Sequence, residues 1–333
     1  MKSKKTSSCV GLDIGSSVIK LVELKFMQDI VELARFDLEP AQADLASLLK
    51  RLSLSQDVNI SVSGASTVIR CIDFPRMSED ELKQSLRFGV QKYIPFPINE
   101  VNLDSYILRE NLSDNKMLVL VAAVKKEFIN QRLKLIREAG LKINIVDLDS
   151  LALVNAFKFN YPQDTDDNIK NRTIAILNIG ASMSNLSILE SGLPVLSRDI
   201  FVAGNNLTQK VQDLVGIDAQ AAEELKLNID KDKEKADNVI SAAESALADL
   251  AKELRISFDY YESQSASSVI RIYLSGGASR FPGLKDMLAN LLSIEVENWD
   301  PFRQISIVDT IDPEKVRALS TQLAVAVGLA LRK

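Results

Sequence analysis

Two short motifs in this chain place a polar side chain beside a glycine and hydroxyl groups. Leu12–Ser17 carries Asp13 with a glycine two positions later, and Leu177–Ser182 carries Asn178 with a glycine at the same spacing. Glycine lets a ligand approach the backbone closely, and the N–H groups and hydroxyls of a tight turn can hold phosphate oxygens. A carboxylate such as that of Asp13 can position Mg²⁺, usually through water. The two motifs therefore predict two phosphate-binding hairpins.

The two motifs belong to an internal repeat. A constant offset of 165 residues aligns them without a gap, and it also aligns Leu21 with Leu186 and Leu24 with Leu189. Either motif alone is more typical of an ordinary β-hairpin with a glycine in its turn. The pair reverses that preference, because each copy falls at the start of a predicted domain. Two such hairpins, one from each domain, would hold the phosphates of a nucleotide from opposite sides.

Apolar patterns predict the elements that would position these hairpins. Strands are expected at Cys9–Asp13, Val18–Leu24, Val58–Ser63, Ser66–Asp73, Leu118–Val124, Ile143–Asp147, Thr173–Asn178 and Ile270–Leu274. Helices are expected at Ser78–Lys92, Lys126–Ala139, Ser150–Phe159, Ala242–Tyr261, Pro282–Leu292 and Ser320–Arg332. Ser78 followed by Glu81 indicates a capped helix start. The polar segment 161–172 is the best candidate for a domain boundary, and the charged run 228–238 is expected to be a solvated loop or a helix start.

The composition excludes several classes of function. The chain has 333 residues, enough for two domains, a net charge of −5 and no histidine. The negative charge argues against a general nucleic-acid binder, and the lack of histidine excludes His-dependent triads and His–metal sites. Cys9 and Cys71 cannot form a zinc cluster and are expected to be reduced, as in the cytosol. The longest apolar runs, Met117–Val124 and Leu323–Leu331, are too short to span a bilayer, so work at a membrane would need a partner.

Two more segments extend the pattern of the hairpins. Leu274–Ala278 is an apolar strand followed by glycines, and Ala222–Lys226 places a glutamate and a lysine three positions apart. With Asp13–Ser17 and Asn178–Ser182, and in this order, they resemble the sugar kinase, heat-shock chaperone and actin superfamily. Lys20 stands where actin uses a phosphate-contacting lysine.

The resemblance to this superfamily implies a nucleotide site. The residues it assigns to ATP or ADP are Asp13, Gly15, Ser16, Ser17, Lys20, Asn178, Gly180, Ala181, Ser182, Gly204, Asn205, Glu223, Lys226, Gly276, Gly277 and Ala278. Asp13 is also implied to hold Mg²⁺ through water. No catalytic residue is assigned, because apart from Asp13 no acidic residue can be placed over the γ-phosphate.

A second resemblance extends over the full length of the chain. It rests on Val10–Ser17, Phe74–Ser78, Lys92–Pro97, Glu100–Asp104, Glu253–Tyr261 and Asp300–Phe302. These segments resemble the PilM family of type IV pilus assembly proteins, a relative of the cell-division protein FtsA. Tyr93–Pro97 is the most family-specific of them, although a turn that packs Tyr93 and Phe96 on the core would explain it equally well.

The family resemblance implies an α/β fold of the actin-like ATPase type. Two ribonuclease H-like domains would carry an FtsA-like inserted subdomain, 1C. The implied ranges are 1–66 and 141–171 for subdomain 1A, 67–140 for 1C, 172–204 and 266–319 for 2A, and 205–265 for 2B. Residues 320–333 are expected to form a C-terminal helix that returns to the first domain.

The resemblance also implies an adaptor. PilM-like proteins bind ATP, turn it over slowly if at all, and bind the N-terminal cytoplasmic peptide of the inner-membrane protein PilN in a groove between subdomains 1A and 1C. Pilus motor ATPases are a further candidate partner. The protein is expected in the cytoplasm, peripheral to the inner membrane, with membrane association only through partners, since the terminal membrane helix of FtsA has no counterpart before Lys333.

Two other functions remain open for this fold. An actin-like filament former would scatter light on addition of ATP. A small-molecule kinase would turn over near ~10 s⁻¹ with its acceptor.

One residue departs from the superfamily pattern. The second phosphate motif usually begins with aspartate, and here it begins with Asn178. An amide keeps the shape of the carboxylate and loses its charge. We therefore expect Asn178 to weaken hydrolysis more than binding, and an Asn178→Asp variant to release phosphate faster.

Overall fold

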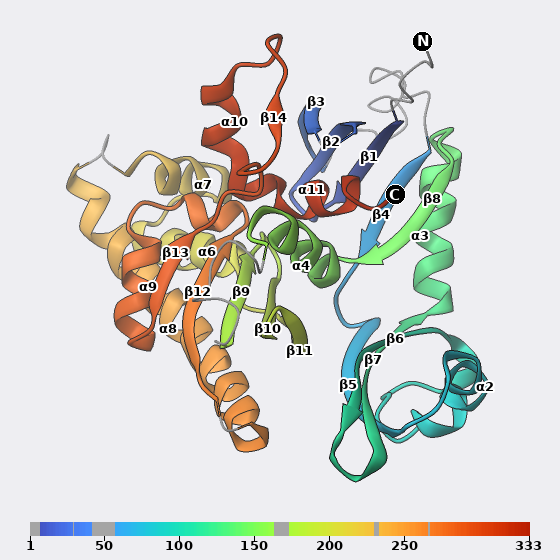
Figure 1. The fold of residues 1–333 in the computed structure, drawn as a ribbon. Coiled ribbons are helices and arrows are strands. Elements are labelled where there is room, and N and C mark those ends of the chain that lie inside the picture. The colour runs from blue at the N-terminus through green and yellow to red at the C-terminus, as the bar shows by residue number, and fades with distance from the viewer. Residues whose placement is uncertain (1–6, 29, 42–56, 163–172, 230–232, 266) are drawn as a thin grey trace.

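The computed structural model describes residues 7–28, 30–41, 57–162, 173–229, 233–265 and 267–333. They form three β-sheets with helices between and around them (Figure 1). The predicted boundary segment 161–172 lies outside the described residues from position 163 onward, and so do residues 230–232 of the charged run.

The first sheet has the strand order β14-β3-β2-β1-β4-β8. Its strands are β1 (Ser7–Ile14), β2 (Val18–Met27), β3 (Ile30–Pro40), β4 (Val58–Val62), β8 (Ile143–Leu148) and β14 (Ser306–Ile307). The strands β1, β2 and β3 form an antiparallel meander, whereas β4 and β8 run parallel to β1. The C-terminal ends of β1, β4 and β8 therefore lie at one edge, where ligands bind in α/β sheets. We call this sheet lobe 1.

The second sheet repeats this arrangement. Its order is β11-β10-β9-β12-β13. The strands are β9 (Thr173–Ile179), β10 (Ser184–Glu190), β11 (Leu193–Ile200), β12 (Val269–Ser275) and β13 (Glu295–Asn298). Again three antiparallel strands are followed by two that run parallel to the first of them. The duplication predicted from the repeat is confirmed, and each motif lies at the first hairpin of its sheet. We call this sheet and the helices α6 (Gly204–Val215), α7 (Ala219–Leu227), α8 (Lys233–Gln264) and α9 (Leu284–Leu292) lobe 2.

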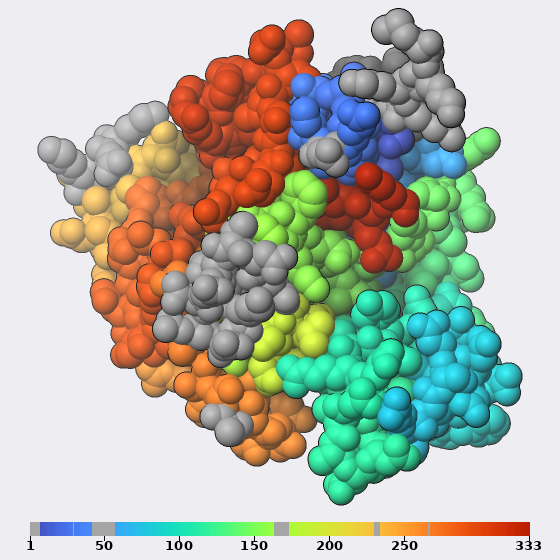
Figure 2. All heavy atoms as spheres, viewed as in Figure 1, coloured from blue at the N-terminus to red at the C-terminus, as the bar shows by residue number. Residues whose placement is uncertain are grey.

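The third sheet is an insertion between β4 and β8. It consists of β5 (Thr67–Pro75), β6 (Val101–Leu112) and β7 (Lys116–Lys125), with β7 in the middle, and it stands out at the lower right of Figure 2. The helix α2 (Glu79–Gly89) packs on one face through Leu82 and Leu86, and its predicted capping box of Ser78 and Glu81 is confirmed. We call residues 67–125 the insert.

Two helices fill the space between the lobes. They are α4 (Asp149–Asn160) and α11 (Ala324–Ala330), and they share one apolar core with strands from both lobes (Figure 1). The remaining helices are α3 (Lys126–Glu138), α6 (Gly204–Val215), α7 (Ala219–Leu227), α8 (Lys233–Gln264), α9 (Leu284–Leu292) and α10 (Pro313–Leu319). Across the ranges described, no helix combines the length and the apolar character needed to cross a bilayer.

Four predicted helices differ from the structure in their bounds. The helix expected over Ser78–Lys92 ends at Gly89, and the helix expected over Ala242–Tyr261 extends over Lys233–Gln264. The helix expected over Ser320–Arg332 is a 3₁₀ segment, Ser320–Leu323, followed by the short α11. The helix expected from Pro282 begins at Leu284, because Gly283 adopts a left-handed conformation with φ of 79° immediately before it. The charged run proves to include a helix start, since α8 begins at Lys233.

The close approach of α11 to α4 gives a first prediction. A Cβ on Gly328 would overlap the carbonyl of Ala152, whereas a Cβ on Gly277 would meet nothing nearer than the Gln322 side chain at 3.7 Å. Overpacking a rigid core costs roughly 1–3 kcal/mol, and backbone atoms cannot move aside as a side chain can. We expect Gly328→Ala to destabilise the protein by at least about 2 kcal/mol in urea denaturation. Equal stability of the Gly328→Ala and Gly277→Ala variants would contradict this packing argument.

Candidate functional site

The first hairpin carries a nearly buried ion pair. Asp13 and Lys20 lie opposite each other on β1 and β2, and Lys20 Nζ donates to Asp13 Oδ2 at 2.8 Å. Their side chains are only 9% and 15% exposed. The turn between them leaves the hydroxyls of Ser16 and Ser17 exposed. The hairpin therefore presents an oriented ammonium group behind two exposed serines.

The second hairpin meets the first. Gly180 N–H donates to Met183 O at 3.0 Å and closes the β9–β10 turn. Ser182 Oγ, in the same turn, donates to Ser16 Oγ at 2.9 Å. This contact joins residues that are 166 positions apart, so the two copies of the repeat meet where the lobes come together.

A third turn and a helix start pack against the second hairpin. Gly204 N–H, at the start of α6, donates to Gly180 O at 3.0 Å, and Asn205 N–H donates to the carbonyl of the next residue, Ala181, at 2.7 Å. Gly276 has φ of 97°, and a Cβ there would overlap the backbone of Ile179. A Cβ on Gly204 would lie 3.4 Å from that of Ala278. Small residues therefore bring three backbone segments together at this point.

Glu223 and Lys226 lie on α7, and both contact α6. Lys226 is 4% exposed, and its Nζ lies 2.6 Å from Glu223 Oε2 and 2.7 Å from Thr208 Oγ1. Partial burial would raise the pKa of Glu223, but hydrogen bonds from Lys226 and Thr208 outweigh it and hold that pKa below its usual value. Lys226 Nζ also lies 3.4 Å from Gly204 O. The ammonium group of Lys226 thus anchors Glu223 to the start of α6.

The residues predicted from the sequence therefore form one continuous set. The first hairpin contacts the second, the second contacts the start of α6 and the turn at 276–278, and α6 contacts Glu223 and Lys226. No predicted site residue lies apart from this set.

Two aspartates near the hairpins were not singled out in the sequence. Ser63 Oγ donates to Asp149 Oδ2 at 2.6 Å, and Asp199 Oδ2 accepts from Gly64 N–H at 2.6 Å. Burial, and after it the negative charge of Asp13, raise the pKa of Asp149 to about 6, although hydrogen bonds from Ser61 and Ser63 lower it. Asp149 stands two residues after the end of the predicted strand Ile143–Asp147 and directly after β8, so its position at the carboxyl end of this strand was a usable signal. Asp199 had no such signal.

The acidic residues do not by themselves enclose a metal ion. Within the described part of the chain, no three acidic, cysteine or histidine side chains gather closely enough to hold one. The donor set therefore fits a Mg²⁺ ion that takes most of its ligands from phosphates and water, with Asp13 acting through water.

Asn178 uses both ends of its amide. Its Nδ2 donates to Asn185 Oδ1 at 3.1 Å, and its Oδ1 accepts from Ser275 Oγ at 3.3 Å. Asn185 Nδ2 in turn donates to Asp199 Oδ1 at 2.8 Å. An aspartate at 178 could not donate to Asn185. The Asn178→Asp comparison suggested by the sequence would therefore change this network as well as the charge.

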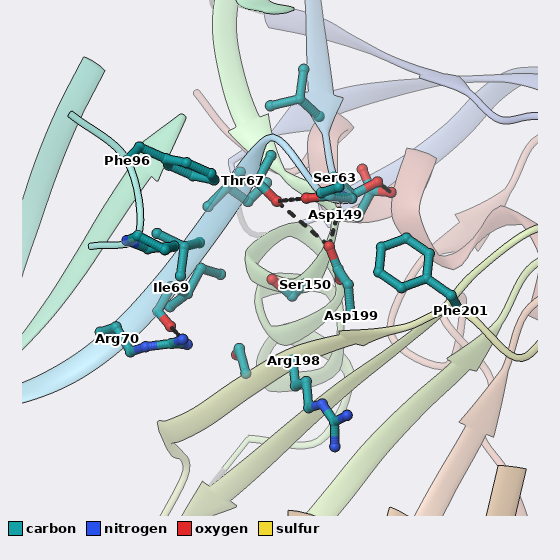
Figure 3. Close-up of a pocket in the computed structure, with 17 residues that line it drawn as sticks. Ser63, Thr67, Ile69, Arg70, Phe96, Asp149, Ser150, Arg198, Asp199 and Phe201 are labelled. Atoms are coloured by element: carbon teal, nitrogen blue, oxygen red, sulfur yellow. Dashed lines mark hydrogen bonds between the residues drawn. The ribbon is translucent and has the colours of Figure 1, made fainter. Parts of the chain in front are cut away.

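A cavity of about 260 Å³ lies beside this network, where lobe 1, the insert and lobe 2 meet (Figure 3). Lobe 1 contributes Ser63 and Asp149, and the insert contributes Ile69 and Phe96. Lobe 2 contributes the β11 segment Ser197–Asp199 and Phe201. Asp199 extends from β11 toward Thr67 and Ser63 in Figure 3. The volume is below the roughly 300–1,000 Å³ of most small-molecule sites and suits one or two side chains of a peptide.

The raised pKa of Asp149 gives a second prediction. The native state disfavours the ionised carboxylate of Asp149. The free-energy cost of ionising it there is absent below about pH 4 and complete above about pH 6. An Asp149→Asn variant should be more stable than wild type by about 3 kcal/mol above pH 6, and this gain should disappear toward pH 4. Urea denaturation across pH 4–8 measures it.

An exposed aspartate on α9 provides the control for this pH series. Asp286→Asn removes the same charge from a solvated position, and we expect no comparable pH-dependent gain. A constant stability difference between Asp149→Asn and wild type over the whole pH range would contradict the prediction.

Comparison with known proteins identifies the family. One chain of a solved structure titled "PilM-PilN type IV pilus biogenesis complex" is 27% identical, with a TM-score of 0.84, over 97% of this chain and 98% of that one. The ethanolamine utilization protein EutJ from Carboxydothermus hydrogenoformans is 13% identical, with a TM-score of 0.56, over 98% of this chain and 90% of its own. It supports the fold alone, and the predicted actin-like ATPase fold class is confirmed. The family model described as "Type IV pilus assembly protein PilM" matches residues 11–333. The chain belongs to the PilM family of type IV pilus assembly proteins.

Proposed function

We propose that this protein is an ATP-binding adaptor of the type IV pilus assembly platform that binds the N-terminal cytoplasmic peptide of a PilN-like inner-membrane protein. The observation that carries the proposal is the contact between Ser16 and Ser182, which brings the two glycine-containing hairpins of the repeat face to face. Phosphates bound beside these two turns would be contacted from both lobes.

The nucleotide part of the proposal assigns a role to each group. Lys20, fixed by Asp13, supplies positive charge for phosphate oxygens, and Asp13 orients the water shell of Mg²⁺. The exposed hydroxyls of Ser16, Ser17 and Ser182 can donate to the phosphates. The turn at 276–278 has no bulky side chain, so a nucleoside can lie against its backbone. Magnesium itself would supply charge neutralisation between the phosphates.

In this proposal the protein hydrolyses ATP slowly at most. Phosphoryl transfer needs charge stabilisation and an oriented attacking group as well as bound phosphates. Asn178 carries no charge, and its amide is occupied by Asn185 and Ser275. Asp149 is the acidic group whose pKa responds to Asp13, and with a pKa of about 6 it is ionised at neutral pH. It is the one candidate for accepting a proton from water in this proposal.

The partner part of the proposal uses the cavity at the insert. The similar solved structure is a PilM–PilN complex, which supports a PilN-like partner here. The cavity is lined by apolar residues such as Ile69 and Phe96 and by charged residues such as Arg70 and Asp199. If the subdomain boundaries proposed from the sequence hold, the cavity lies where 1A and 1C meet. Contacts with pilus motor ATPases and a peripheral place at the inner membrane stay predictions from the family.

The nucleotide site gives a third prediction. An Asp13→Ala variant loses both the partner of Lys20 and the carboxylate that faces Mg²⁺. We expect its Kd for Mg-ATP to rise at least tenfold, which corresponds to about 1.4 kcal/mol. Titration calorimetry measures the Kd, and thermal unfolding verifies that the variant is folded. The exposed-site variant Asp286→Ala should bind as wild type does. Unchanged affinity in a folded Asp13→Ala variant would remove Asp13 from the site.

The partner site gives a fourth prediction. We expect the N-terminal cytoplasmic peptide of the PilN-like protein from the same organism to bind with micromolar affinity, and Phe96→Ala to weaken binding about tenfold, because a half-buried aromatic side chain that lines the cavity is removed. Phe88→Ala is the matched control, since Phe88 is 85% exposed on α2 and does not line the cavity. Equal losses for the two variants would place the peptide elsewhere, and no binding by wild type would reject the adaptor proposal.

A further inference from the structure

We propose that the hydrogen-bonded chain Asn178–Asn185–Asp199, which ends on the backbone of Gly64, couples the nucleotide cleft to the partner cavity, so that ATP and the peptide strengthen each other's binding. We call these three side chains the amide chain. The inference rests on the proposed function, because it describes how the two proposed sites act on each other.

The amide chain starts inside the nucleotide site. Asn178 lies two residues before Gly180, whose carbonyl accepts from the start of α6, and four before Ser182, which contacts Ser16 of lobe 1. Its amide accepts from Ser275 at the end of β12. Asn178 is therefore fixed to the two backbone segments that would border phosphates and nucleoside.

The amide chain then crosses lobe 2 in buried steps. Asn178 is 9% and Asn185 3% exposed, and their hydrogen bonds run from β9 to β10 and on to Asp199 of β11. Leaving a buried amide without its partner costs roughly 1–3 kcal/mol, so breaking any one step is unfavourable. The chain therefore resists changes in the relative positions of its ends.

The amide chain ends in lobe 1, at the wall of the partner cavity. Asp199 Oδ2 accepts from Gly64 N–H at 2.6 Å, and Thr67 Oγ1 lies within 3.5 Å of the same oxygen (Figure 3). Asp199, Gly64 and Thr67 all line the cavity, and so does Asp149, which Ser63 contacts. The Asp199 carboxylate is one point at which lobe 2 is held against lobe 1 and the insert.

The position of the amide chain in the repeat explains the direction of its hydrogen bonds. Asn178 and Asn185 are cross-strand partners, as Asp13 and Lys20 are, and the offset of 165 relates both pairs. Lobe 1 thus carries an ion pair where lobe 2 carries a pair of amides. An amide pair can pass a hydrogen bond onward in a fixed direction, and here it directs the Asn185 Nδ2 group at Asp199.

Both ligands should favour the same arrangement of the lobes. The phosphates would be held by hairpins from both lobes, and the peptide would be enclosed by walls from lobe 1, the insert and lobe 2. A ligand that contacts both lobes stabilises the arrangement in which they are held together, so the second ligand binds a structure that is already formed. The amide chain makes the two contacts one cooperative unit.

The direction of the hydrogen bonds provides a reversal test. Asn178→Asp leaves Asn185 facing a carboxylate at both ends, and only one of them can accept from its amide nitrogen. Adding Asp199→Asn restores every bond with reversed polarity: the new carboxylate accepts from Asn185, the Asn185 oxygen accepts from the new amide, and that amide's oxygen accepts from Gly64. The double variant also keeps the net charge of wild type.

The experiment measures peptide affinity by calorimetry with and without saturating Mg-ATP. In wild type we expect ATP to strengthen peptide binding at least fivefold, and the peptide to strengthen ATP binding by the same factor. Asp199→Ala and Asn178→Asp should reduce the factor to about one, and Asn178→Asp/Asp199→Asn should restore it. Asp286→Asn is the control for a charge change outside the chain and should keep the wild-type factor.

A second readout does not need the peptide. Phe201 lines the cavity and is 61% exposed, while the single native tryptophan, Trp299, is buried. In a Phe201→Trp background, ATP should change the indole emission, Asn178→Asp should abolish the change, and the double variant should restore it.

The outcomes separate this inference from the proposed function. If both ligands bind wild type but neither alters the other's affinity, the coupling is refuted and the adaptor function stands. If the peptide does not bind, the partner proposal fails, and the indole response alone decides. No ATP-dependent response, or a response that Asn178→Asp leaves intact, overturns the inference.

Discussion

The close packing of α11 between the two lobes is the constraint on which the rest of the structure depends. A Cβ on Gly11 of β1 would overlap the carbonyl of Ala326, and one on Gly328 would overlap that of Ala152. Backbone therefore touches backbone on both sides of α11, so β1, α11 and α4 form one rigid layer. Strands of both lobes share the core around this layer. The first hairpins of the two lobes are thereby held close together, and Ser16 contacts Ser182.

The two halves of the repeat have kept their geometry and changed their chemistry. The register that pairs Asp13 with Lys20 in lobe 1 pairs Asn178 with Asn185 in lobe 2. An ion pair offers charge to a ligand, whereas two amides offer directional hydrogen bonds that can continue into a third side chain. In this protein the third side chain is Asp199, which also binds the backbone of lobe 1.

The sequence was most informative where the signal was local. The hairpins, the capping box of α2 and the duplication follow from turn residues and a constant offset. The strand β3 was not predicted, because a bulge opposite Glu23 and Leu24 interrupts its alternation between Leu33 and Phe36. The segment Ser320–Arg332 was predicted as one helix, because its apolar run gives no sign of the 3₁₀ turn at Ser320–Leu323.

The parts of the site that could not be predicted depend on tertiary contacts. Asp199 lies on the third strand of lobe 2, far in sequence from Gly64, which it binds. The same holds for the cavity, whose walls come from three segments of the chain that only the fold brings together. Asp149 differs from these, since a polar residue at the carboxyl end of a predicted parallel strand is a recognised place for chemistry.

The charges around Asn178 give a physical reason for its neutral side chain. Asp149 already experiences the charges of Asp13 and Asp199, and burial with these neighbours raises its pKa to about 6. A fourth carboxylate at 178 would add repulsion to this group and to the phosphates that the proposed site receives. An amide keeps the hydrogen bonds to Ser275 and Asn185 without that repulsion. Such a site favours holding a nucleotide over activating water, and a ligand that is held but not consumed stabilises the arrangement of lobes that binds it.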